Sequence, residues 1–225
     1  NTDSRRIYLM LFNIAPHDLA ALLSSKLCHD LISPVGAINN GLELLEEGGA
    51  DEDAMNLIKN SARTASARLQ YARIAYGAAG SAGVQIDTGD ARNVAVGFMM
   101  GEKAELTWEG GRFFLPKNQV KLLLNMLQIA NGSIPRGGKL AVTIEGDETN
   151  PVFVIKSAGP MLRVPARFLE LYSGAPEHEP IDAHSIQAYY ALLLARETNM
   201  AINVNAGTED ITITIKRQDA AAAAA

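Results

Sequence analysis

The fold is decided by one stretch, Lys26-Leu27-Cys28-His29-Asp30-Leu31-Ile32-Ser33-Pro34-Val35-Gly36, which lies inside a long helical pattern. Aliphatic residues recur here every three or four positions, the spacing of one buried helix face. This seam consists of Leu19, Leu23, Leu27, Leu31, Val35, Ile38, Leu42 and Leu45. We therefore predict one helix from Pro16 to about Glu47, with the proline in its favourable first turn.

His29 does not belong to that seam, because it lies two residues from both Leu27 and Leu31, roughly 200° around the helix. Its own face is mostly small or polar, which suits the close approach of another protein. That face consists of Ser25, Lys26, Ile32, Ser33, Gly36 and Asn40. Pro34 cannot donate to the carbonyl of Asp30, so it costs stability and loosens the turn that carries His29. A solvated helix face would show the same motif, so the motif alone leaves both interpretations open.

A second helix is predicted over residues 51–77, after the stop signal Gly48-Gly49. Its apolar positions are Ala54, Ile58, Ala62, Ala65, Leu69, Ala72 and Tyr76. Arg63, Arg68 and Arg73 lie on other faces, and we expect them to be solvated. A helical hairpin has an apolar face with nothing to cover it, so we expect a homodimer in which two hairpins form a four-helix bundle.

The small residues from 77 to 83 form a linker, and the hydrophobic period changes beyond them. We divide the chain into a helical hairpin for dimerisation (1–79), an α/β domain (80–218) and a low-complexity alanine-rich tail (219–225). The tail is excluded from the fold.

Beyond the linker, short β-type runs alternate with helical ones. We expect an extended segment at 84–87, strands at 104–108, 140–145, 151–156, 201–204 and 211–215, and helices at 90–100, 116–131, 165–172 and 182–198. Helices mixed with strands in this way indicate a two-layer α/β sandwich of four or five strands. The fold class is therefore α+β, a helical hairpin followed by that sandwich.

Composition is that of an ordinary globular protein, with 48% hydrophobic and 20% charged residues. A net charge of −5 without a basic stripe argues against a nucleic-acid partner. One cysteine, Cys28, fits a reducing compartment; we expect it at the edge of the helix packing, with a thiol nucleophile as the alternative. No apolar run of membrane-spanning length and no signal peptide are found, so we expect a cytoplasmic protein without membrane contact. His17, His178 and His184 lack metal-ligand spacing, and no metal site is expected.

A hairpin with an exposed His-Asp-x-x-x-Pro, a linker and an α/β sandwich resembles the layout of sensor histidine kinases. The first half resembles their dimerisation and phosphoacceptor domain, and the second their Bergerat-type ATP-binding domain. Asn125-Met126-Leu127-Gln128-Ile129-Ala130 looks like the asparagine-box helix. Val154-Ile155-Lys156-Ser157-Ala158-Gly159-Pro160 looks like the strand that leads into the adenine box.

The resemblance to the kinases does not extend to the residues that bind ATP and magnesium. Ile129 stands in place of the asparagine that binds magnesium, Ser157 in place of the adenine-reading aspartate, and Met161 in place of a glycine. The stretch 182–187, where the phosphate loop should fall, contains no glycine. Triphosphate binding needs metal ligands and bare backbone N–H groups. The domain therefore resembles a degenerate ATP-binding domain, and we expect no ATP and no other cofactor.

Over residues 16–217 the chain is similar to the dimeric histidine phosphotransferases of alphaproteobacterial cell-cycle phosphorelays. The resemblance implies that His29 accepts a phosphoryl group from the receiver aspartate of a hybrid histidine kinase and passes it to response regulators. It also implies that the receiver supplies the aspartate, a lysine and Mg²⁺.

Neutral imidazole is a competent nucleophile, and an acceptor at its Nδ1 would fix the tautomer; adjacent Asp30 is our candidate. The receiver would dock on the face around His29, that is on Ser25, Lys26, Ile32, Ser33, Gly36 and Asn40. The alternative is a non-catalytic docking scaffold derived from a histidine kinase.

Overall fold

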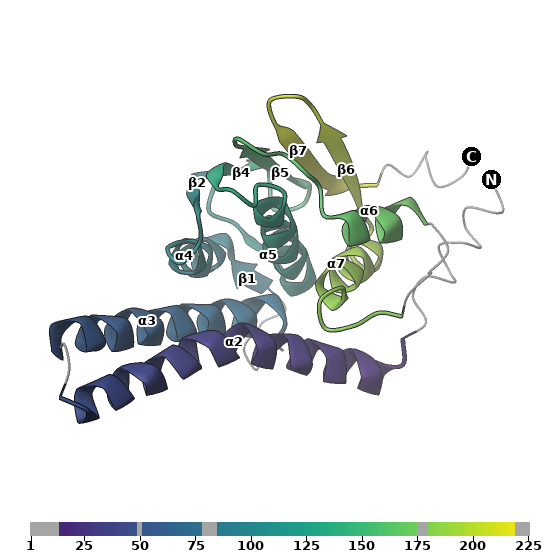
Figure 1. The fold of residues 1–225 in the computed structure, drawn as a ribbon. Coiled ribbons are helices and arrows are strands. Elements are labelled where there is room, and N and C mark those ends of the chain that lie inside the picture. Colours follow the sequence, from purple (N-terminus) through teal and green to yellow (C-terminus); the bar gives the residue numbers. More distant parts are fainter. Residues whose placement is uncertain (1–13, 49–50, 78–84, 175–179, 219–225) are drawn as a thin grey trace.

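The computed structural model describes residues 14–48, 51–77, 85–174 and 180–218. Two long helices, α2 (Pro16–Glu46) and α3 (Asp51–Ala75), form an antiparallel hairpin along one side of the α/β part (Figure 1). Both predicted helices are confirmed to within two residues at their ends. The predicted boundary between residues 79 and 80 and the tail from 219 to 225 lie outside the described residues.

The hairpin is closed by small residues at the contact between its helices. Gly41 is buried on α2, and a Cβ there would lie 2.6 Å from Cγ1 of Ile58 and 3.1 Å from the carbonyl oxygen of Ala54. Glycine at this position therefore lets the two backbones approach closely. Pro34 is the other buried residue of α2, and the helix continues through it.

The predicted apolar seam is incompletely buried in the single chain. Val35, Leu42 and Leu69 are 46%, 47% and 49% exposed. These positions belong to the face that we expect a second hairpin to cover, and the single chain leaves them open. The physical reason is that each helix of a two-helix hairpin can cover its neighbour on one side only.

The α/β part is built on a mixed five-stranded sheet, and all five predicted strands are confirmed. In spatial order they are β2 (Ala104–Gly110), β4 (Gly138–Gly146), β5 (Pro151–Ala158), β7 (Ile211–Arg217) and β6 (Met200–Ala206). β2 runs parallel to β4, and the other neighbouring strands are antiparallel.

One face of this sheet is covered by helices, which lie between the sheet and the hairpin (Figure 1). They are α4 (Thr88–Met99), α5 (Lys117–Gly132), α6 (Ala166–Ser173) and α7 (Ile186–Glu197). Side chains of β4, β5 and β7 alternate between buried and partly exposed, as expected for a sheet with one covered face. The predicted two-layer sandwich and the α+β class are confirmed.

Two short segments depart from expectation at the start of this part. β3 (Phe114–Pro116) pairs with β1 (Gln85–Asp87) in a two-stranded sheet. β3 was not predicted, because three residues are too few to show a hydrophobic period. α4 begins at Thr88, two residues earlier than predicted, since the Asp87 carboxylate accepts from the N–H of Gly89 at 2.7 Å and caps the helix.

The last helix begins later than predicted, at Ile186 and not at Asp182. The Asp182 carboxylate accepts from the N–H groups of His184 (3.1 Å) and Ser185 (2.8 Å), which folds these residues into a turn before α7. The prediction was wrong because aspartate favours a local turn as readily as a helix start.

The core lies between α5 and the sheet. Leu122, Leu123 and Leu124 are fully buried, as are Phe153 and Ile155 on β5. The hairpin is tied to this core, because the hydroxyl of Tyr71 on α3 donates to the carbonyl oxygen of Leu124 at 2.6 Å.

Candidate functional site

His29 lies near the middle of α2 with its side chain 64% exposed. The residues predicted to share its face surround it with a mostly open surface: Ser25, Ile32, Ser33 and Asn40 are exposed, and Lys26 and Gly36 are half-buried. Ile32 is 71% exposed, and a Cβ at Gly36 would meet no described atom within 4 Å. The face can therefore admit another protein without rearrangement of the helix.

The Asp30 carboxylate is shared between two neighbours on α2. Its Oδ2 accepts from Nζ of Lys26 at 2.8 Å, and its Oδ1 lies 3.8 Å from Nδ1 of His29. The second distance is too long for a hydrogen bond. The bond that we expected between Asp30 and His29 is thus not formed in this conformation, and Lys26, half-buried, holds the carboxylate beside the ring.

The surroundings of His29 include a residue that sequence reasoning missed as a neighbour. The ring of His184, from the turn before α7, meets the His29 ring edge-on, with centroids 4.9 Å apart and planes at 80°. His184 is exposed. Nothing in the spacing of two histidines so far apart in the chain could indicate this contact, which depends on how the hairpin packs against α7. His178 lies outside the described residues.

Arg68 also departs from expectation. Its side chain is 28% exposed, and its Nη1 donates to the backbone carbonyl oxygen of Asp30 at 2.5 Å. The prediction of a solvated arginine was wrong, because the carbonyl that Pro34 leaves without a helix donor lies within its reach.

A partly buried polar network lies where the hairpin meets α5 and α7. The Tyr76 hydroxyl donates to Oε1 of Gln128 at 3.3 Å, and the side-chain amide of Gln187 donates to the same oxygen. Burial raises the pKa of Tyr76, and the nearby charge of Asp30 raises it further. The phenol therefore stays protonated and acts as a donor at neutral pH.

The positions that resemble a nucleotide site are occupied by the protein's own packing. Ser157 is fully buried, and its hydroxyl donates to the carbonyl oxygen of Ala130 at 3.0 Å. Ile129 is 5% exposed and belongs to the core. The amide of Asn125 donates to the carbonyl oxygens of Ala75 (3.2 Å) and Lys121 (2.9 Å), so it supports the end of α3.

Within the described ranges, no helix has the length and apolar character needed to cross a membrane. Over the same ranges, no group of three His, Cys, Asp or Glu side chains is arranged to hold a metal ion.

Comparison with known proteins identifies the family. Residues 88–210 match the family model of the histidine phosphotransferase C-terminal domain. The chain is 72% identical over 194 residues to the protein phosphotransferase ChpT of Brucella abortus (strain 2308), which covers 86% of this chain and 93% of that protein. This chain belongs to the histidine phosphotransferase family.

Solved structures extend the comparison. A bacterial phosphotransferase solved at 1.7 Å is similar to this histidine phosphotransferase, with a TM-score of 0.87 and 66% identity over 90% of this chain and 98% of that one. The histidine kinase AdeS of Acinetobacter baumannii is similar at 15% identity and a TM-score of 0.46, over 84% of this chain and 97% of that one. Like the Brucella protein, this chain is a protein phosphotransferase, and the family predicted from the sequence is confirmed.

Proposed function

We propose that this histidine phosphotransferase works in a bacterial phosphorelay and carries the phosphoryl group on His29. The donor is the receiver aspartate of a hybrid histidine kinase, and the acceptors are the receiver aspartates of response regulators. The observation that carries the proposal is the 64% exposed imidazole in the middle of α2, at the centre of an open and mostly polar face. A nucleophile that must reach a group held by another protein needs this exposure.

The chemical step is a reversible exchange between two proteins. A lone pair of the neutral imidazole, on Nε2, attacks the phosphorus of the receiver's aspartyl phosphate. The new N–P bond forms as the P–O bond to the aspartate breaks, and the receiver regains its carboxylate. Catalysis of this kind depends mainly on positioning and on neutralising charge.

Asp30 is the group in this proposal that steadies the ring. The positive charge that develops on the imidazole lies next to the carboxylate, whose Oδ1 is 3.8 Å from Nδ1 in the unloaded chain. A small rotation of either side chain brings these atoms within hydrogen-bond distance, and the N–H of Nδ1 then donates to Asp30. Lys26 holds the other oxygen of the carboxylate.

The phosphoryl group comes from a protein and not from ATP. Buried Ile129 and the internal hydrogen bond of Ser157 support this part of the proposal, since neither is free to serve a nucleotide. The Mg²⁺ that the reaction uses belongs to the receiver domain.

A homodimer is part of the proposal, and it rests on what we name the heptad stripe. The stripe consists of exposed residues seven apart on each helix: Cys28, Val35 and Leu42 on α2, and Met55, Ala62 and Leu69 on α3. Contacts of Gly41 with Ala54 and of Asp30 with Arg68 place the two rows at matching levels. Exposed apolar residues at heptad spacing on two antiparallel helices are typical of one half of a four-helix bundle.

We retain two further predictions within the proposal. The first is the division into a dimerisation and phosphotransfer hairpin (1–79) and a degenerate ATP-binding-like domain (80–218). The second is a cytoplasmic location, in keeping with the free thiol of Cys28.

The test is transfer of label from a receiver domain. A hybrid-kinase receiver, labelled with ³²P on its aspartate and freed of nucleotide, is mixed with wild type, His29→Ala or His17→Ala. His17 lies on the same helix with its side chain 82% exposed, so it is the matched control. Label should move to wild type and to His17→Ala but not to His29→Ala, and a second receiver should then take it.

Two results would contradict the proposal. Transfer to His29→Ala would place the phosphoryl group on another residue. Absence of label on wild type, with a panel of receivers, would favour the docking scaffold.

A further inference from the structure

Pro34 leaves a gap in the hydrogen bonding of α2 next to His29. In an α-helix the N–H of residue i+4 donates to the carbonyl oxygen of residue i, and proline has no N–H. The oxygen without a helix donor is therefore that of Asp30, the residue after His29. Pro34 is buried, so water on that side of the helix is restricted. An unpaired carbonyl at this point would weaken the turn that carries the imidazole.

The gap is closed by a side chain of the other helix. Nη1 of Arg68 on α3 donates to the Asp30 oxygen at 2.5 Å. A hydrogen bond from a charged donor is shorter and stronger than a neutral one. The guanidinium thus replaces the missing backbone N–H from outside the helix.

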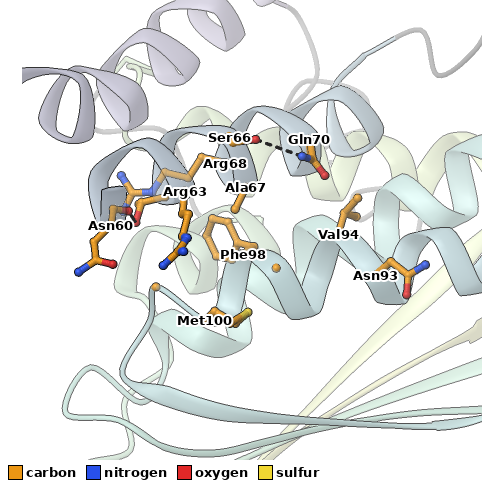
Figure 2. A pocket seen from close by; sticks show the side chains of 13 residues that line it. Asn60, Arg63, Ser66, Ala67, Arg68, Gln70, Asn93, Val94, Phe98 and Met100 are labelled. Atoms are coloured by element: carbon orange, nitrogen blue, oxygen red, sulfur yellow. Dashed lines mark hydrogen bonds between the residues drawn. The ribbon is translucent and has the colours of Figure 1, made fainter. Parts of the chain in front are cut away.

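Arg68 is itself held in place by the α/β part. Its Nη2 lies 3.9 Å from Oε1 of Glu102, in the connection after α4. The other oxygen of Glu102 accepts from Nδ2 of Asn131 on α5 at 3.1 Å. Figure 2 shows Arg68 beside Arg63 and Phe98, at the edge of the hollow between α3 and α4. A chain of contacts therefore runs from α5 to the turn of His29.

We infer that Arg68 is a positioning residue for His29, because its guanidinium takes the place of the backbone donor that Pro34 removes. The inference rests on the proposed role of His29 as phosphoacceptor. Phosphoryl transfer between proteins needs the nucleophile in line with the bond that breaks, and a displacement of about 1 Å can cost about 100-fold in rate. Without a backbone N–H at Pro34, the carbonyl of Asp30 is free to accept from α3, and the hydrogen bond from Arg68 holds it in that orientation.

The test is a double-mutant cycle with wild type, Arg68→Ala, Pro34→Ala and the double variant. The readouts are the maximal rate constant of transfer from the ³²P-labelled receiver and the receiver concentration at half-maximal rate. Arg68→Ala should lower the maximal rate constant by about 10-fold or more, with the half-saturating concentration unchanged. In the Pro34→Ala background the same change should cost less than about 3-fold, because replacing the proline restores the backbone N–H that Asp30 lacked.

Two variants sharpen the cycle. Arg63→Ala removes an exposed arginine from the same helix and should leave the rate constant unchanged. Arg68→Lys keeps a charged donor and should recover part of the lost rate. If Arg68→Ala lowers the maximal rate constant by the same factor in the wild-type and the Pro34→Ala backgrounds, the inference is overturned. A raised half-saturating concentration with an unchanged maximal rate would also overturn it, since Arg68 would then serve receiver docking.

Failure of the proposed function is recognised separately. If His29→Ala takes up label as wild type does, His29 is not the acceptor, and the rate cycle no longer reports on its position. Thermal unfolding of the four proteins then decides whether Arg68 caps the carbonyl. A smaller shift in Tm on loss of Arg68 in the Pro34→Ala background supports the cap, and an equal shift contradicts it.

Discussion

Helices α2 and α5 show how differently the two halves of this protein use hydrophobic residues. In α2, 31 residues long, Pro34 and Gly41 are the buried positions. In α5, 16 residues long, eleven positions are buried, among them three consecutive leucines. The α/β half is therefore stabilised by its own core, whereas the hairpin leaves apolar surface uncovered and holds the His29 side chain in solvent.

This contrast separates the proposed phosphoacceptor from the core that stabilises the fold. The hairpin presents His29 on a scaffold with few buried contacts, in keeping with a site that meets other proteins. In the α/β half, buried Ile129 and Ser157 stand at positions where the sequence resembles a nucleotide site. It touches the site through His184 and, by way of Glu102, through Arg68.

The largest effect is expected at the proposed dimer interface. Leu42→Asp puts a carboxylate into the heptad stripe, and each dimer would bury two such charges. We expect the dimer to weaken by roughly 1,000-fold or more, because an unpaired buried charge costs several kcal/mol. Light scattering across a concentration series measures this. Leu44→Asp makes the same substitution at an exposed position two residues along α2, about 200° around the helix, and should leave the dimer intact. An intact Leu42→Asp dimer would refute the stripe as the interface.

The next largest effect is expected in the core of the α/β half. Leu124→Ala empties a fully buried position of α5 and should lower the free energy of unfolding by about 3 kcal/mol. Leu44→Ala, on α2 outside the heptad stripe and 45% exposed, should cost less than about 1 kcal/mol. Urea unfolding at one protein concentration measures the free energy of unfolding of both variants. Equal decreases would contradict the difference in burial between the two halves.

Two glycines of α2 sharpen the picture of the hairpin. Gly36→Ala has free space and should stabilise the helix by about 1 kcal/mol through propensity. Gly41→Ala brings a Cβ against Ile58 and the Ala54 carbonyl, and overpacking should outweigh that gain by about 1 kcal/mol. Thermal unfolding at matched protein concentration measures the two changes in Tm, which should be a rise for Gly36→Ala and a fall for Gly41→Ala.

Gly36→Leu should slow label transfer from the receiver while the dimer persists. An unchanged transfer rate would show that Gly36 is not part of the docking face.

The smallest effect concerns pH, at the start of the α/β half. Arg112 donates from Nε to the Asp87 carboxylate at 2.7 Å, and this bond holds the pKa of Asp87 below its usual value. The stabilisation is complete above the unfolded pKa, about 3.9, and is lost as pH falls through the lowered one. Asp87→Asn should therefore lower Tm at pH 7, and the difference in Tm from wild type should shrink as the pH falls below the unfolded pKa. A Tm difference independent of pH would contradict the ion pair.

Much of the fold could be predicted because its signals are local. Helical spacing from Leu19 to Leu45 defined α2, and alternating isoleucines at 211–215 defined β7. The start of α7 was wrong because Asp182 folds a local turn, which competes with a helix on equal terms.

The site was predictable only in the part that lies on one helix. The open face around His29 follows from helical geometry, whereas the neighbours His184 and Arg68 arrive through tertiary packing. A missing donor at Pro34 could have indicated that some side chain must serve Asp30. It could not have indicated which one.

The most direct test of the account is to locate the phosphoryl group in the wild-type chain. The protein is loaded from a phosphorylated receiver without nucleotide, quenched in alkali to preserve an N–P bond, and sequenced by tandem mass spectrometry. We predict phosphate on His29 alone, lost on brief acid treatment. Phosphate on His184, whose ring lies 4.9 Å away, or on any other residue would contradict the account.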